Sequence, residues 1–228
     1  MARCPSLLIA AAAAPLVAAG TAVAAFMVTG THRTLNVSPA EARRRLPGDE
    51  LLPHADVQND RAITIAAPPA QVWPWIAQLG QDKAGFYSFA CLENALGCQV
   101  RNADHIVPEW QHPHVGDPFP LHPDIVLRIA LIEPGHAFVV SSAGGSAPKD
   151  MGFEFTWAFV LTYRPGEGDG GGATRLHVRE RYDTHSSSVH ALTEVTSVAS
   201  AIMSWKMLDT LKRLAEAAPV TDQSQQPR

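Results

Sequence analysis

The chain has 228 residues, of which 46% are hydrophobic and 18% charged, and its formal net charge is −4. This composition argues against disorder throughout, and it argues against a general nucleic-acid binder, because that function needs a basic surface. Three cysteines are too few for a disulfide-stapled scaffold. The length is typical of one domain with a short appendage.

The first thirty residues have a distinct composition, in which Arg3 is the one charged side chain. Residues 7–28 are mostly Ala, Leu, Val and Ile, and about 20 apolar residues suffice to span a bilayer. We therefore expect residues 1–30 to form a transmembrane anchor. The alternative is a secretory signal that is cleaved after Ala22-Val23-Ala24.

The charges that follow this segment predict its orientation. Arg33 and the run Arg43–Arg45 lie after it, whereas Arg3 and the α-amino group lie before it. The positive-inside rule then places the rest of the chain in the cytoplasm, as the soluble part of a single-pass membrane protein. If the segment is instead a cleaved signal, the mature chain is secreted.

Residues 31–59 are expected to be a connector, because Pro39, Pro47, Gly48 and Pro53 interrupt every periodic pattern there. The main domain is expected over residues 60–217. The polar residues 218–228 are expected to be a disordered tail.

The domain is predicted to open with a strand and two short helices. Residues 61–66 alternate between polar and apolar side chains, which is typical of a strand. Pro68-Pro69 ends this strand and opens a helix over residues 70–80, since proline is tolerated in a first helical turn. A second helical region covers residues 85–96 and ends at Gly97.

Strands are predicted to dominate the middle of the chain, over residues 117–121, 125–133 and 137–142. A hairpin follows, with arms over 153–163 and 174–182 joined by a glycine-rich turn. Its second arm separates two kinds of side chain. We expect one set to face the core and the other to form a solvated outer surface: Leu176, Val178, Glu180 and Tyr182 inward, and Arg175, His177, Arg179 and Arg181 outward.

The domain is predicted to close with a long helix over residues 189–217, about 40 Å long. Its apolar residues recur at three- and four-residue spacing: Leu192, Val195, Ala199, Ile202, Met203, Leu208, Leu211 and Leu214. This order predicts an α+β fold, in which a curved antiparallel sheet wraps around the long C-terminal helix. A cavity is expected between the two.

Residues 61–217 resemble the START-like helix-grip superfamily (SRPBCC, or polyketide cyclase/dehydrase-like), both in the opening strand with Ala67–Trp73 and in the terminal helix. Five stretches are similar to an actinobacterial membrane-anchored subgroup: LPGDELL at 46–52, GFYS at 85–88, LEN at 92–94, ADHIVPEW at 103–110 and Gly116-Asp117. The resemblance implies a helix-grip fold whose cavity holds a lipid, polyketide, sterol or aromatic compound.

Aromatic residues, and polar residues on apolar faces, are the candidates for such a cavity. Tyr87, His105 and Glu180 are candidate proton-transfer groups for a cyclisation or dehydration. The alternatives are that the aromatic residues fill the core, that the polar loop residues brace turns, and that Glu180 pairs with a neighbouring arginine. The full set of ligand-binding candidates is Trp73, Phe86, Tyr87, Phe89, Glu93, Asn94, Asp104, Trp110, Phe155, Trp157, Phe159, Glu180 and Met203.

No metal or cofactor is expected. The histidine clusters, at 112–122 and 185–190, lack the spacing and the companion ligands of a zinc site, and no nucleotide-binding motif is present. We predict that the protein binds a hydrophobic small molecule, such as a lipid or polyketide, for transport or presentation at the membrane. The alternatives are a cyclase/dehydratase-like enzyme and a non-catalytic, protein-interacting or stress-related module. Beyond the ligand and the membrane no partner is predicted, and the oligomeric state is left open.

Overall fold

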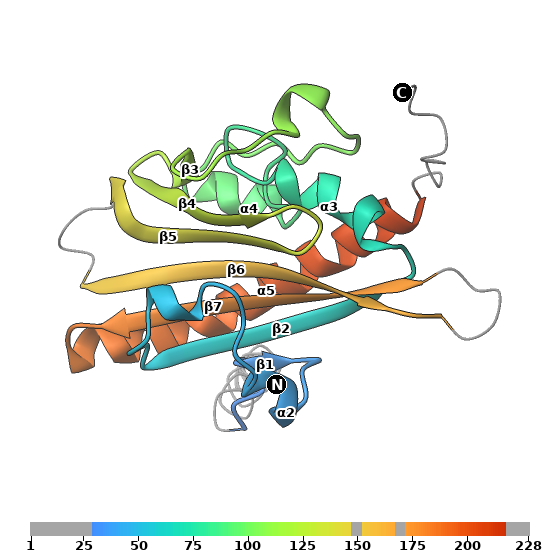
Figure 1. The fold of residues 1–228 in the computed structure, drawn as a ribbon. Helices are drawn as coiled ribbons and strands as arrows, with labels where there is room; N and C mark the ends of the chain where they lie inside the picture. The colour runs from blue at the N-terminus through green and yellow to red at the C-terminus, as the bar shows by residue number, and fades with distance from the viewer. Residues whose placement is uncertain (1–28, 147–151, 167–171, 218–228) are drawn as a thin grey trace, which may run out of the picture.

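The computed structural model describes residues 29–146, 152–166 and 172–217, which form a seven-stranded sheet packed against one long helix (Figure 1). The strand order is β1-β2-β7-β6-β5-β4-β3, and every neighbouring pair is antiparallel except β1 with β2. The strands are β1 (Thr34–Leu35), β2 (Val57–Ile65), β3 (Pro118–His122), β4 (Ile125–Glu133), β5 (Ala137–Ser146), β6 (Phe153–Arg164) and β7 (Ala173–Thr184). The helices are α2 (Pro39–Ala42), α3 (Pro69–Ala77), α4 (Ala90–Ala95) and α5 (Ser187–Ala217), with 3-10 turns η1 (Asp49–Leu51) and η2 (Pro108–Trp110).

The predicted α+β architecture is confirmed for this part of the chain. Strand β2 is followed by the short helices α3 and α4, then by the antiparallel strands β3 to β7, and last by α5. Figure 1 shows α5 running along one face of the curved sheet, where it contacts β2, β7 and α3. This is the helix-grip arrangement that the sequence resemblance implies.

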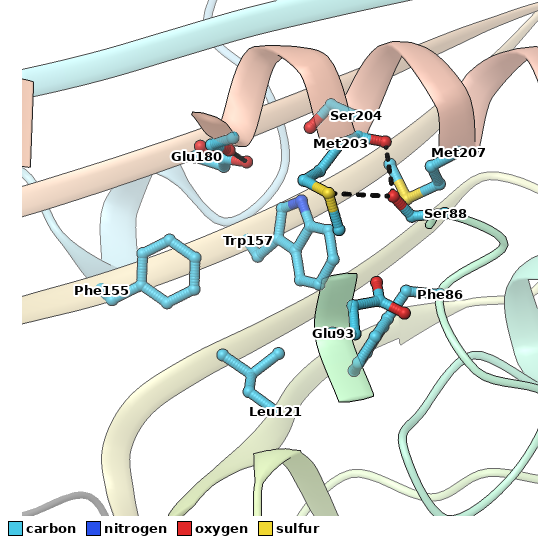
Figure 2. Close-up of a pocket in the computed structure, with 11 residues that line it drawn as sticks. Phe86, Ser88, Glu93, Leu121, Phe155, Trp157, Glu180, Met203, Ser204 and Met207 are labelled. Atoms are coloured by element: carbon cyan, nitrogen blue, oxygen red, sulfur yellow. Dashed lines mark hydrogen bonds between the residues drawn. The ribbon is translucent and has the colours of Figure 1, made fainter. Parts of the chain in front are cut away.

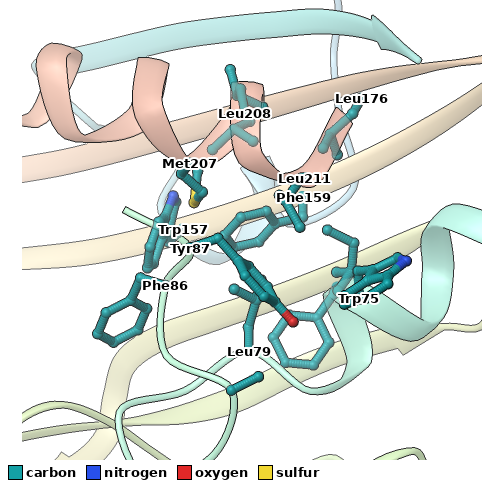
Figure 3. Close-up of a cluster of buried hydrophobic side chains, with 14 of the residues drawn as sticks. Trp75, Leu79, Phe86, Tyr87, Trp157, Phe159, Leu176, Met207, Leu208 and Leu211 are labelled. Atoms are coloured by element: carbon teal, nitrogen blue, oxygen red, sulfur yellow. The ribbon is translucent and has the colours of Figure 1, made fainter. Parts of the chain in front are cut away.

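The core lies between the inner face of the sheet and the helices α3 and α5. Figure 3 shows Trp75 of α3, Phe159 of β6 and Leu208 and Leu211 of α5 gathered around Tyr87. All five side chains are at least 96% buried. Aromatic side chains bury large apolar areas, so this cluster supplies much of the stabilisation of the fold.

Helix α5 turns a different face inward from the one that the sequence predicts. In its first half the buried residues are small, namely Thr193, Ser197, Ala201 and Ser204, and large apolar side chains take over from Met207 onward. The predicted core residues Leu192, Val195 and Ile202 are exposed instead. Small inward side chains leave room between the first half of α5 and the sheet.

The segment before β2 is part of the fold, which corrects the expectation of a connector over residues 31–59. Residues 57–59 belong to β2 itself, and β1 extends the sheet by pairing with it. Helix α2 is capped by Ser38, whose hydroxyl accepts a hydrogen bond from the Glu41 N–H at 3.2 Å. The backbone N–H of Ser38 and the cationic Arg175 lower the pKa of Glu41 to about 2. Glu41 thereby ties α2 to β7.

This N-terminal cover, defined as residues 29–53, also corrects the expectation of a solvated arginine and histidine face on β7. Arg179 is 2% exposed and His177 is 6% exposed, because α2 and η1 lie over them. Asp60 accepts hydrogen bonds from both, each at 2.7 Å. Burial acts to raise the pKa of Asp60, but the His177 hydrogen bond and the Arg179 charge hold it below its ordinary value.

Within the residues that the structure describes, no helix is long and apolar enough to cross a membrane. The segment predicted as an anchor lies outside the described residues, except for its last two positions. The predicted tail over residues 218–228 also lies outside them.

Candidate functional site

A cavity of about 140 Å³ lies where the small residues of α5 face the sheet. Figure 2 shows its lining, which combines three aromatic residues, two methionines and a leucine with three serines and two glutamates. An engineered cavity of about 150 Å³ in another protein binds benzene, so this volume suits roughly one ring. The lining residues are Phe86, Ser88, Glu93, Leu121, Phe155, Trp157, Glu180, Ser200, Met203, Ser204 and Met207.

Strand register brings the polar groups of one wall together. Asn59 of β2 pairs with Glu180 of β7, which in turn pairs with Trp157 of β6. Directly opposed residues share one face of a sheet, so all three side chains point toward α5. Asn59 and Glu180, which are 121 positions apart in the sequence, therefore lie in one row with Trp157.

Glu180 is held as an ion by its neighbours. Its carboxylate lies 2.8 Å from Arg61 Nη1 and accepts hydrogen bonds from Ser200 Oγ at 2.7 Å and Asn59 Nδ2 at 3.2 Å. Burial acts to raise the pKa of Glu180, but the Arg61 charge and these hydrogen bonds hold it below its ordinary value. A carboxylate so fully paired fixes the wall of the cavity, as the ion-pair alternative predicts, and is poorly placed to donate a proton.

Glu93 differs from Glu180 although both line the cavity. Its side chain projects from α4, the residue is 8% exposed, and its Oε2 has no hydrogen-bond partner among the described residues. Burial raises the pKa of Glu93 to about 7. Near neutral pH this group therefore exists in both protonation states, and it can donate or accept a hydrogen bond inside the cavity.

Trp157 also lines the cavity, and it carries a second buried polar atom without a partner. The indole Nε1–H is buried and likewise finds no acceptor within the described ranges. Buried polar groups are normally hydrogen-bonded, and leaving one unpaired costs about 1–3 kcal/mol. An apolar cavity with one unpaired donor and one unpaired carboxyl oxygen suits a small apolar molecule that carries a polar substituent.

The turn at Gly85–Ser88 positions the rim of the cavity. Tyr87 has a φ of +56°, which is rare for a bulky residue, and its N–H donates to Asn102 Oδ1 at 2.8 Å. Asn102 Nδ2 in turn donates to the Ser88 carbonyl at 2.8 Å. Held in this way, the Ser88 hydroxyl donates to the Met203 carbonyl of α5 at 3.0 Å, a contact drawn in Figure 2.

Replacing Gly85 with alanine should disrupt this turn. Gly85 has a φ of +71°, and a Cβ there would lie 2.5 Å from Asn102 Oδ1. We expect a loss of more than the 1–2 kcal/mol that a left-handed conformation alone costs, measured by urea unfolding. Gly135→Ala is the matched control, since Gly135 has a φ of +75° with nothing within 4 Å of an added Cβ. Equal losses in the two variants would show that the Asn102 contact is unimportant.

Glu93→Gln should change the pH dependence of stability. The pKa of Glu93 is about 7 in the folded chain, against an ordinary value of 4.5. The folded chain therefore binds more protons between these values, and wild-type stability falls as pH rises across that window. We expect equal stability near pH 4 and a variant more stable by about 1–3 kcal/mol at pH 8. The exposed Glu109→Gln should show no such gain, and a flat difference across pH for Glu93→Gln would contradict the buried environment.

The structure separates the predicted ligand-binding residues into four groups. Phe86, Glu93, Phe155, Trp157, Glu180 and Met203 line the cavity. Trp73, Tyr87, Trp110 and Phe159 belong to the core or pack against it, and Phe89 is a half-buried residue that precedes α4. Asn94 and Asp104 are exposed.

The other two candidate proton-transfer residues lie away from the cavity. His105 is exposed and pairs with Asp104 at 2.9 Å. Tyr87 is fully buried, and its hydroxyl accepts a hydrogen bond from Gln78 Nε2 at 2.8 Å. Burial raises the pKa of Tyr87 above its ordinary value. Asn94 braces a loop by accepting from the Val100 N–H and donating to the Val100 carbonyl. These contacts agree with the bracing alternative.

Five lining residues are absent from the predicted set, namely Ser88, Leu121, Ser200, Ser204 and Met207. The serines of α5 had a detectable signal, because Ser197, Ser200 and Ser204 recur at helical spacing as a stripe of small residues. Ser88 and Leu121 had none, since their position depends on a turn and on an outer strand.

The fold and cavity together define a helix-grip protein with a small, mostly apolar site between α5 and the sheet. No protein-family model and no curated protein sequence matches the chain. Solved structures similar to it include norcoclaurine synthase from Thalictrum flavum, with 12% identity, a TM-score of 0.42, and coverage of 81% of this chain and 98% of that one. Protein MLL2253 from Mesorhizobium loti has 16% identity, a TM-score of 0.38, and coverage of 71% and 99%.

A third similar structure is the di-domain ARO/CYC protein StfQ from the steffimycin biosynthetic pathway. It shares 14% identity with this chain at a TM-score of 0.37, and the match covers 74% of this chain and 53% of StfQ. Likenesses at this level do not assign a function to the chain. The superfamily resemblance agrees with the strand order and helix placement described above, and the membrane-anchored subgroup stays a prediction.

Proposed function

We propose that this protein binds a small apolar molecule with one polar substituent in the cavity between α5 and the sheet. The observation that carries this proposal is the apolar lining around the unpartnered oxygen of Glu93. Burial of the apolar part supplies affinity at about 25 cal/mol per Å². A hydroxyl or carbonyl on the ligand then pairs with Glu93 or with the Trp157 N–H, which fixes its orientation.

Native mass spectrometry of the full-length protein, purified in detergent without delipidation, tests this proposal. We expect a bound compound of small mass, which solvent extraction releases and identifies. Ser204→Leu, which fills the cavity from α5, should abolish the bound mass, while Ala199→Leu on the exposed face of the same helix should retain it. A clean ligand-free mass that also survives exposure to a lipid extract would contradict binding and favour a role in protein contacts.

A proton-transfer enzyme is the second candidate, and the pKa of about 7 at Glu93 favours it. Glu93 replaces Tyr87, His105 and Glu180 as the candidate general acid or base, because it combines cavity lining with a titratable, unpaired oxygen. Cyclisation and dehydration both need such a group. Conversion of the extracted compound by wild type but not by Glu93→Gln would establish the enzyme, whereas binding without turnover would leave a carrier.

We further propose that the protein acts at a membrane, held there by residues 1–30, with the described domain in the cytoplasm. The support is the uncharged stretch over residues 7–28 and the arginines that follow it. Full-length protein should remain in the membrane pellet after a carbonate wash. A mature N-terminus near Ala25 would instead establish a cleaved signal.

A further inference from the structure

A second hollow lies on the opposite face of the sheet from the cavity, between the N-terminal cover and β7. Its volume is about 510 Å³, and it is lined by five arginines. Arg179 and Arg181 alternate with Glu180 along β7, so they point away from α5. The other three, Arg43, Arg44 and Arg45, follow α2 directly.

The acidic groups nearby pair with the arginines of β7, and they leave Arg43–Arg45 without a counter-ion among the described residues. Asp49 lies 2.6 Å from Arg179 Nη1 and 3.1 Å from Arg181 Nη1, and Asp60 accepts from Arg179 Nε. Glu50, the other acidic residue of the hollow, accepts a hydrogen bond from the Gly48 N–H. Arg43–Arg45 are exposed, and within the described ranges none of their side chains forms an ion pair. The hollow therefore has an excess of positive charge.

The backbone that holds these arginines is fixed in place. Arg179 donates to the carbonyls of Ala42 at 2.8 Å and Arg44 at 2.9 Å, and Gln58 Nε2 donates to the Ala42 carbonyl at 3.0 Å. Three hydrogen bonds thus anchor the turn after α2 to the sheet. A fixed backbone reduces the entropy that is lost when the side chains it carries bind an anion.

One buried donor in the hollow lacks a partner. Arg181 Nε is buried and forms no hydrogen bond with any of the described residues. Leaving a charged group's N–H unpaired is unfavourable, and the side chain lines the hollow. This observation is independent of the excess charge, and both point to an anionic ligand.

We propose that the arginine-lined hollow binds a phosphate group. The planar fork of arginine matches phosphate oxygens in a bidentate geometry, and several guanidinium groups can surround one phosphate. The phosphate can belong to a soluble phosphate ester or to the headgroup of an anionic lipid. A lipid is favoured if residues 7–28 span the bilayer, since they end fifteen residues before Arg43.

Isothermal titration of the full-length protein with inorganic pyrophosphate tests this site, using protein in phosphatidylcholine nanodiscs. We expect binding that weakens with added salt and that falls at least tenfold in Arg43→Ala/Arg45→Ala. Both positions are exposed, so the double variant should fold normally. Arg101→Ala, at an exposed arginine in the loop after α4, is the matched control and should bind like wild type.

A second arm distinguishes the two sources of phosphate. In nanodiscs that contain phosphatidylglycerol, a lipid-headgroup site should already be occupied, and pyrophosphate should bind several-fold more weakly than in phosphatidylcholine. A site for a soluble phosphate ester should bind pyrophosphate equally in both. Absence of binding in phosphatidylcholine, or equal binding by wild type and the Arg43→Ala/Arg45→Ala variant, would overturn the proposal.

Discussion

Replacing Arg61 with methionine should destabilise the fold by about 3–5 kcal/mol, because it leaves the buried Glu180 carboxylate without its counter-ion. Arg61 is fully buried and its guanidinium lies 2.8 Å from Glu180. The remaining hydrogen bonds from Ser200 and Asn59 do not offset a full charge. Urea unfolding at pH 7 measures this loss.

The double variant Arg61→Met/Glu180→Met is the control for this prediction. Replacing a buried ion pair with apolar residues of similar volume is often neutral, so the double variant should recover most of the loss.

The pH dependence of stability in the single variant Arg61→Met should be the reverse of that in wild type. In wild type the lowered pKa of Glu180 gives stability that is lost as pH falls. In Arg61→Met the Ser200 and Asn59 hydrogen bonds remain, but burial outweighs them and raises the pKa of Glu180, so stability should fall as pH rises above about 4.5. A double variant as unstable as the single one would contradict the account.

Arg179→Met should lower the stability of the fold by a similar amount, about 3–5 kcal/mol. It should also loosen the N-terminal cover. The substitution removes the cation that pairs with Asp60 and Asp49 and the donor that holds the Ala42 and Arg44 carbonyls. Besides the global loss, we expect faster trypsin cleavage after Arg43–Arg45, since that turn is released from the sheet.

Arg213→Met is the control for Arg179→Met, because Arg213 is 64% exposed by its side chain and its contact with Asp209 is 4.0 Å long. Exposed ion pairs typically contribute no more than about 1 kcal/mol. Unchanged trypsin cleavage at residues 43–45 in Arg179→Met would show that the cover is held by other contacts.

The order of strands and helices could be predicted from the sequence, because it depends on local periodicity. The strand predicted over residues 125–133 coincides with β4, and the predicted hairpin coincides closely with β6 and β7. Phe155, Trp157 and Phe159 alternate along the first arm of this hairpin, and all three are buried. Such patterns report which side of an element is apolar.

Pairing between distant segments could not be predicted from one sequence. Arg179 reads as a solvated residue on β7, and only the position of Asp49 and Asp60 across from it explains why it is buried. The start of β2 was missed for the same reason, since Asn59 and Asp60 look like loop residues until their partners are known.

The existence of a cavity was predicted from the sequence, but only some of the residues that line it were. Six predicted residues line it, yet the sequence pattern placed Leu192, Val195 and Ile202 of α5 in the core, where the structure has Ser197, Ala201 and Ser204. An amphipathic pattern favours the more apolar face of a helix as the buried one. Here a cavity and a polar row on the facing strands make the small, polar face the inner one.

Methionine-methyl NMR of the full-length protein, titrated with phenol, tests the central claim most directly. Met203 and Met207 line the cavity, and the other methionines, Met1, Met27 and Met151, lie outside the described residues. The variants Met203→Leu and Met207→Leu assign the two cavity signals, which then report on the site. We predict that phenol shifts both signals in a saturable manner, that Ser204→Leu abolishes the shifts, and that Ala199→Leu retains them. We expect benzene to bind more weakly than phenol in the same titration, because it lacks the hydroxyl that pairs with Glu93. Signals that do not move with either compound, or that move equally in Ser204→Leu, would contradict a ligand site between α5 and the sheet.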